Sequence, residues 1–104
     1  MKVLVDAKNF VVTKGLRQFV KAQADKLSKV AGKVLDVRVY LESVEKKTND
    51  PKAKKVIYQI KVPGKNLVIR KKGVEMYETI TSTTKAALRK LRKQTEKIRT
   101  LRRQ

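Results

Sequence analysis

Lysine and arginine are the side chains of this sequence that are best suited to bind a ligand. The chain of 104 residues holds 28 of them against nine Asp and Glu, which gives a formal net charge of +19. Holding so many like charges close together opposes folding, so we expect the charge to serve a large anionic partner. The phosphates of a nucleic acid fit that partner best, and a membrane surface fits it less well.

Catalytic and metal-binding side chains are scarce by comparison. The sequence has no Cys and no His, so it lacks thiolates, the commonest metal ligand and the commonest general base. Asp36 and Glu42 would share one face of a strand, but six residues place them about 20 Å apart, too far to share an ion. We therefore predict that the protein is not an enzyme and uses no metal, no cofactor and no small-molecule substrate.

The densest cluster of bases is the segment KAALRKLRKQTEKIRTLRR, residues 85–103, in which nine residues are basic and only Glu96 is acidic. On a helix with about 100° per residue that begins before this segment, Ile80, Thr84, Leu88, Leu91 and Ile98 gather within about 80°, and bases such as Arg89 and Lys93 spread over the opposite side. A disordered tail needs no such segregation. A charged helix exterior is usually just solvated, but a solvated face normally mixes both signs. We therefore interpret this segment as an amphipathic helix whose outer face binds a polyanion.

An earlier amphipathic segment, residues 14–31, also carries bases outside its apolar stripe. If both helices cover one face of a sheet, their basic sides form a single wide surface. Such a surface fits structured RNA or duplex phosphates better than one narrow groove does. The predicted RNA-binding residues are Arg17, Lys21, Lys26, Lys29, Lys85, Arg89, Arg92, Lys93 and Lys97.

The elements that must position these bases follow from the hydrophobic pattern. Apolar residues alternate in four stretches, which we predict to be strands: residues 2–6 (with a possible extension over 10–12), 34–45, 55–62 and 67–71. Thr13 is a candidate N-cap for the first helix and Gly32 a candidate stop. Glu75 and Glu78 carry the charge that favours the start of a second helix of about 28 residues.

The order of these elements predicts an α+β fold, β-α-β-β-β-α, with a four-stranded mixed sheet and two helices packed on one face. A right-handed crossover makes the first two strands parallel. A chain of this length fits one domain, residues 1–104.

Individual side chains carry further expectations. We expect Leu35 to face the core with the other alternating residues of its strand, and we expect Tyr58 and Tyr77 in the core because they lie in apolar phase. Tyr40 is expected on the open face of the sheet, either as an ordinary surface residue or stacked on a base. Residues 46–55 are expected to form a flexible connection that either touches RNA or is simply mobile.

Two segments resemble the ribosome hibernation-promoting factors, the HPF/RaiA/YfiA family. AKNFVVTKGLRQFVKAQADKL, residues 7–27, is similar to the first strand and helix of that family. GVEMYETI and LRKLRKQTEK, within residues 73–97, are similar to its second helix, and the element order agrees over the whole chain.

The match can be followed residue by residue. Arg17 and Lys26 match basic positions of the family's first helix, and Arg89 and Lys93 match those of its second. Where this sequence departs from the family pattern, at Thr81, Lys85 and Ala86, the second helix becomes more basic.

The resemblance implies a ribosome hibernation factor. It would bind the small ribosomal subunit in the mRNA and tRNA channel near the decoding region and block translation in stress or stationary phase. The chain is similar to the short form of the family, without a C-terminal dimerisation domain. The sequence shows no signal peptide and no apolar run long enough to span a membrane, so we expect a cytoplasmic protein, and we expect a monomer off the ribosome. Whether it promotes or opposes ribosome pairing stays open. The alternative is a general binder of double-stranded or structured RNA without a ribosomal role.

Overall fold

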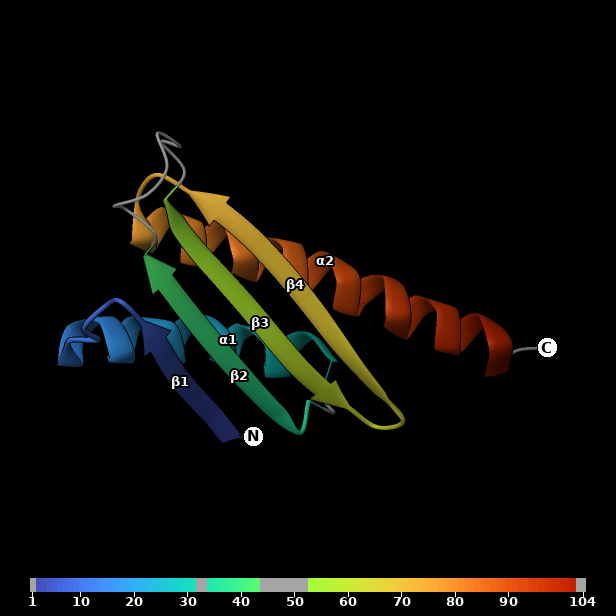
Figure 1. Ribbon diagram of the computed structural model, residues 1–104. Coiled ribbons are helices and arrows are strands. Elements are labelled where there is room, and N and C mark those ends of the chain that lie inside the picture. The colour runs from blue at the N-terminus through green and yellow to red at the C-terminus, as the bar shows by residue number, and fades with distance from the viewer. Residues whose placement is uncertain (1, 32–33, 44–52, 103–104) are drawn as a thin grey trace.

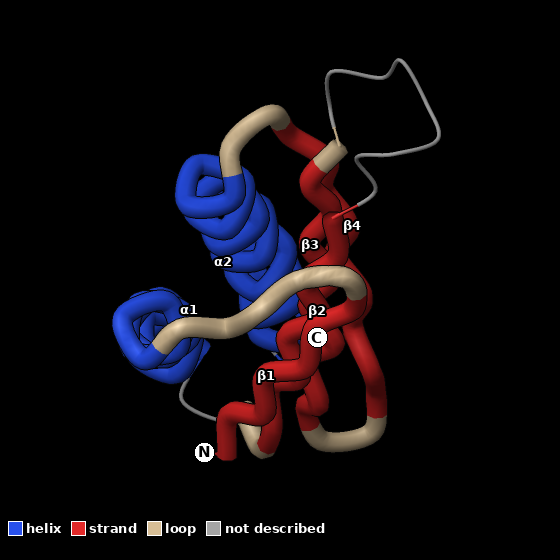
Figure 2. Tube along the Cα trace, turned by 60° about the vertical axis from the view of Figure 1, so that its left-hand side comes forward, coloured by secondary structure: helices blue, strands red, loops and turns tan. Residues whose placement is uncertain are grey.

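The computed structural model describes residues 2–31, 34–43 and 53–102, with only the backbone of residues 30–31 and 95–102 (Figure 1). Its elements are β1 (Lys2–Lys8), α1 (Lys14–Ala31), β2 (Asp36–Ser43), β3 (Lys54–Val62), β4 (Lys65–Gly73) and α2 (Met76–Arg102). The strands lie side by side in chain order, with β1 parallel to β2 and the other pairs antiparallel. Both helices lie on the same face of the sheet (Figure 2). The predicted fold is therefore confirmed.

The core lies between this face and the helices. Alternate residues of the central strands point into it, so that Val37, Val39 and Leu41 of β2 are almost fully buried, as is Tyr58 of β3. The prediction for Tyr58 is confirmed.

The entry into β2 differs from the prediction. Leu35 is 48% exposed, so its assignment to the core was wrong. The buried place is taken by its neighbour Val34, because β2 begins only at Asp36 and residues 34 and 35 precede its regular alternation.

The first strand ends before the predicted extension. Asn9 adopts the left-handed region with φ 54°, which turns the chain out of the sheet. Residues 10–12 therefore lie outside any strand, and the expectation that they extend β1 was wrong. The turn carries the chain to Thr13, whose Oγ1 accepts a hydrogen bond from the Leu16 amide at 3.1 Å. Thr13 thus caps α1 as predicted. The predicted stop at Gly32 and most of the expected connection at 46–55 lie outside the described residues.

Helix α2 begins with a stretch rich in threonine, a residue that is normally unfavourable inside helices. Here each threonine hydroxyl donates to the carbonyl four residues earlier, for example Thr83 to Thr79 at 2.7 Å and Thr84 to Ile80 at 2.9 Å. Thr83 and Thr84 are fully buried against the sheet. These hydroxyls need no water, so a polar stretch serves as part of the core.

A hydrogen bond joins this helix to the sheet. The Tyr58 hydroxyl lies 2.8 Å from Thr84 Oγ1. Because the single proton of Thr84 is already given to the Ile80 carbonyl, the Tyr58 hydroxyl is the donor and Thr84 Oγ1 the acceptor. The contact fixes the depth at which α2 lies on β3.

Candidate nucleic-acid interface

The two helices present a layer of cations on the side that faces away from the sheet. Of the nine predicted RNA-binding residues, eight have described side chains, and all eight are exposed: Arg17, Lys21, Lys26, Lys29, Lys85, Arg89, Arg92 and Lys93. The side chain of Lys97 lies outside the described residues. Exposure leaves these groups hydrated and available to phosphates.

An aromatic contact fixes how the two helices face each other. The rings of Phe19 on α1 and Tyr77 on α2 are 4.9 Å apart between centroids and tilted by 57°. Tyr77 remains 44% exposed, so its assignment to the core was wrong. The buried stripe of α2 instead contains its neighbours Met76 and Ile80, which leaves Tyr77 at the boundary between the helices.

From this contact the two helices run in the same direction (Figure 1). Lys26 follows Phe19 by seven residues and Lys85 follows Tyr77 by eight, about two turns in each case. At about 100° per residue, seven residues bring Lys26 to within about 20° of Phe19, whereas eight residues turn Lys85 about 80° away from Tyr77. Lys26 therefore lies on the side of α1 that faces α2, and Lys85 lies nearer the outer side of α2.

A shallow hollow of about 380 Å³ lies on the outer side of α2 next to this boundary. Its lining combines an aromatic ring, hydroxyls and one cation: Tyr77, Glu78, Thr81, Ser82 and Lys85. Hydroxyl groups and an ammonium can bond phosphate and ribose oxygens. The exposed Tyr77 is a feature that the sequence pattern missed, because its position fits the apolar phase of the helix.

The remaining cations spread outward from that boundary. Arg17 and Lys21 lie about 160° around α1 from Phe19, on the flank turned away from α2. Lys93 lies about 160° around α2 from Tyr77, on the flank turned away from α1. The structure therefore places Lys26 beside the boundary of the helices and Lys85 on the outer side of α2 next to it, and it spreads the other bases across a broad layer. Such a layer can contact phosphates of several RNA segments at once.

Two exposed cations of this layer were not predicted as RNA-binding residues, Lys14 and Lys90. Lys14 directly follows the capping Thr13, and Lys90 lies within the densest basic run. Their exposure in the structure is what makes them further candidates for RNA binding.

The acidic residue just before α2, Glu75, caps this helix. Glu75 Oε1 accepts a hydrogen bond from the Tyr77 amide at 3.0 Å, and Oε2 accepts one from the Glu78 amide at 2.8 Å. A carboxylate at this position also offsets the positive end of the helix dipole. Glu75 thus serves the fold, and the basic part of α2 begins about three turns later at Lys85.

Comparison with known proteins identifies the family of this architecture. The family model described as sigma 54 modulation protein / S30EA ribosomal protein matches residues 3–99. The chain belongs to this family. Sigma 54 modulation protein / S30EA ribosomal proteins are ribosome-associated hibernation and modulation factors, and the family is not enzymatic. This confirms the family resemblance and the prediction that the protein is not an enzyme.

Two solved structures share the S30EA fold. The N-terminal domain of Protein Y from Thermus thermophilus is 17% identical, with a TM-score of 0.77 over 89% of this chain and 98% of that one. A ribosomal subunit interface protein from Coxiella burnetii is 15% identical, with a TM-score of 0.69 over 96% of this chain and 99% of that one. At these identities the likeness establishes the fold.

A shorter similarity links the chain to large ribosomal subunit protein uL3 from Methanococcus aeolicus, 45% identical over 47 residues. It covers 45% of this chain, and the chain spans only 14% of the length of that protein. This partial match is much shorter than the S30EA match and leaves the assignment unchanged.

Other classes of site find no support in the described part of the chain. Residues 2–31, 34–43 and 53–102 hold no group of three or more carboxylate, His or Cys side chains that could bind a metal ion. No helix among the described residues is long and apolar enough to cross a membrane.

Proposed function

We propose that this S30EA-family protein binds the small ribosomal subunit in the mRNA and tRNA channel near the decoding region. The observation that carries the proposal is the broad layer of exposed cations over α1 and α2. Helix α1 contains a single acidic residue, Asp25. A channel walled by rRNA offers phosphates on several sides, which suits a convex basic surface. The Coxiella burnetii relative is described as a ribosomal subunit interface protein, and this supports the same location.

The mechanism is occlusion. The protein fills space that tRNA and mRNA need, so translation stops without any bond being made or broken. Lys26, at the boundary of the helices, and Lys85 and Arg89, on the outer side of α2, neutralise rRNA phosphates. Arginine adds bidentate contacts that lysine does not make. Translation is blocked in this way in stress or stationary phase.

Residues 1–104 act as a single ribosome-binding domain in this proposal. The protein is a monomer off the ribosome, because repulsion between surfaces of net charge +19 opposes self-association. Its location is the cytoplasm, where its partner is found.

Binding in this channel is tested by competition on the small subunit. Purified small subunits are loaded with a labelled mRNA and tRNA, and the protein is then titrated in. We expect release of tRNA near one protein per subunit. Because phosphate contacts release counterions, apparent affinity should fall by about 10³–10⁵ between 50 and 200 mM salt if six or more contacts form. Retention of tRNA at saturating protein would contradict the proposed location, and equal binding to any structured RNA would favour the general RNA binder.

A further inference from the structure

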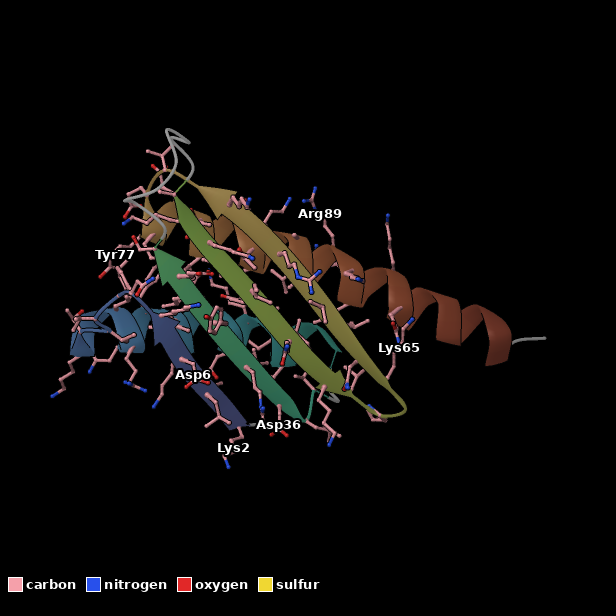
Figure 3. All side chains as sticks on the ribbon, in the orientation of Figure 1. Lys2, Asp6, Asp36, Lys65, Tyr77 and Arg89 are labelled. Carbon is pink, nitrogen blue, oxygen red and sulfur yellow. The ribbon has the colours of Figure 1, made fainter. Side chains whose placement is uncertain are left out.

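The face of the sheet that the helices leave open is a second surface, and the ribosome-binding proposal does not use it. Figure 3 shows this face with Lys2, Asp6 and Asp36 labelled. The strand register arranges its side chains in rows. One row holds Tyr40, Ile57 and Arg70 on β2, β3 and β4, and the next holds Arg38, Gln59 and Val68.

Four apolar or aromatic side chains lie on this face. Leu4 on β1 and Val68 on β4, the two edge strands, are 39% and 37% exposed, and Tyr40 and Ile57 on the central strands are partly buried. Neighbouring strands are about 4.8 Å apart and the rows about 6.8 Å apart along a strand. An aromatic ring and aliphatic side chains on such a surface form a platform on which bases can stack.

Charge is distributed unevenly around this platform. The carboxylates of the open face lie on β1 and β2, where Asp36 has Lys2 and Lys61 as cross-strand neighbours and Glu42 has Lys8 and Lys55. On β3 and β4 the face carries cations and no acid. These cations are Lys55, Lys61, Arg70 and Lys72. This half of the sheet therefore has a positive potential beside the apolar rows, which attracts phosphates.

A hollow of about 350 Å³ opens on the same face. The side chains around it include two cations and two amides, which can bond phosphates and base edges respectively. Its lining is Asp36, Arg38, Gln59, Ile60, Lys61, Asn66 and Val68. The open face thus combines stacking, phosphate-binding and base-bonding groups within neighbouring rows.

We infer that the open sheet face binds single-stranded RNA, with a base stacked on Tyr40, the next nucleotide over the hollow beside Arg38, and the phosphates on the cations of β3 and β4. An extended strand places one nucleotide on each row. Duplex RNA cannot use this surface, because its bases are paired and its stacking faces are covered. The protein would then hold structured RNA on its helices and a single strand on the opposite side.

The test must separate base stacking from the general attraction of RNA to a highly basic protein. Binding of a fluorescently labelled 12-nucleotide oligouridylate is measured by anisotropy at 150 mM salt. Tyr40→Ala keeps the net charge and should weaken binding about tenfold, within the range for loss of one stacked base. Val11→Ala, the control, shortens an exposed side chain of the loop between β1 and α1, outside both surfaces, and should change affinity less than twofold.

A pair of charge reversals gives the second arm. Arg38→Glu/Arg70→Glu alters the open face, and Arg89→Glu/Lys93→Glu alters the helix layer by the same amount. The first should weaken oligouridylate binding more than tenfold beyond the second, and the order should be opposite for the small subunit. Loss of ribosome binding in Tyr40→Ala is not expected, so this inference and the proposed function can fail separately.

Cross-linking keeps the test independent of any folding defect. Oligouridylate containing 4-thiouridine is irradiated with the unaltered protein, and the linked peptides are identified by mass spectrometry. Links to residues of β2, β3 and β4 support the inference. Links to α1 and α2 alone, or equal effects of Tyr40→Ala and Val11→Ala, would overturn it. Binding of a glutamate-rich peptide as tight as that of the oligonucleotide, and insensitive to Tyr40→Ala, would assign the face to an acidic protein and also overturn it.

Discussion

The hydrogen bond from Tyr58 to Thr84 predicts that substitutions of its two partners will lower stability by different amounts. Tyr58→Phe removes the donor, but the Thr84 hydroxyl keeps its own bond to the Ile80 carbonyl. The cost is then one net hydrogen bond, about 1 kcal/mol of unfolding free energy. A change of that size lowers the Tm of a domain of this size by about 4–8 °C.

Thr84→Val is expected to cost more. It leaves the hydroxyl of the fully buried Tyr58 without an acceptor, and an unpaired buried group costs about 1–3 kcal/mol. In the Tyr58→Phe background the same change leaves no buried hydroxyl without an acceptor and should cost about 0.5 kcal/mol or less. The two changes should therefore be coupled by about 1–2 kcal/mol.

The assay is a double-mutant cycle in urea, followed by circular dichroism. All four proteins must show the same m-value for the free energies to be compared. Additive costs, or a cost for Tyr58→Phe as large as for Thr84→Val, would refute the assignment of Tyr58 as donor to Thr84.

Alkaline pH supplies an independent check on the same residue. Burial raises the pKa of Tyr58 to about 12 from an ordinary value of 10. The folded state therefore holds this proton more tightly than the unfolded state does. Its contribution to stability is complete below pH 10 and is lost as pH rises from about 10 to 12, by roughly 2–3 kcal/mol. The quantity to measure is the difference in unfolding free energy between the unaltered protein and Tyr58→Phe, because it cancels the contributions of other groups. This difference should start at about 1 kcal/mol in favour of the unaltered protein, pass through zero and reverse across this range.

Two further predictions concern the way α2 is attached. Gly73→Ala places a Cβ against the buried Thr79 Oγ1 and should lower the free energy of unfolding by about 1–3 kcal/mol. Gly15→Ala adds a Cβ in α1 that meets no atom within 4 Å beyond its own helical turn, so it should raise that free energy by about 0.5–1 kcal/mol. Equal effects of the two changes in thermal melts would contradict this account. Glu75→Ala removes the carboxylate that accepts the Tyr77 and Glu78 amides and should cost about 1 kcal/mol, and no loss in urea unfolding would show that the cap does not stabilise α2.

Much of the fold could be predicted because the spacing of apolar residues and the capping residues of helices are local signals. The alternation of β2 and β3 and the hydroxyl of Thr13 are readable in short windows of sequence. Tyr77 shows the limit of this reading, since its phase on the helix fits the core but its ring lies at the boundary with Phe19. Leu35 shows another, since the buried position at the start of β2 depends on how the chain arrives from α1.

The site was predictable in composition but not in arrangement. The bases stand out in the sequence, and the exposure of those with described side chains agrees with their assignment to the outer faces of the helices. Which of them face one another depends on how α1 lies against α2, a contact between residues far apart in the chain. The sequence therefore yields a set of cations, and the structure places Lys26 beside α2, Lys85 on the outer side of α2, and Arg17, Lys21 and Lys93 on the flanks.

The central claim is that the cations of the helix layer hold the protein on the small ribosomal subunit. The most direct test is co-sedimentation of the purified protein with small subunits and 70S ribosomes through a sucrose cushion, without mRNA and with free duplex RNA as competitor. Arg89→Glu/Lys93→Glu and the matched Arg38→Glu/Arg70→Glu reverse the same number of charges on opposite faces. We predict saturation near one copy per small subunit, resistance to duplex competitor, and loss of binding in the helix variant alone. Equal loss in both variants, or binding that any RNA removes, would contradict the claim.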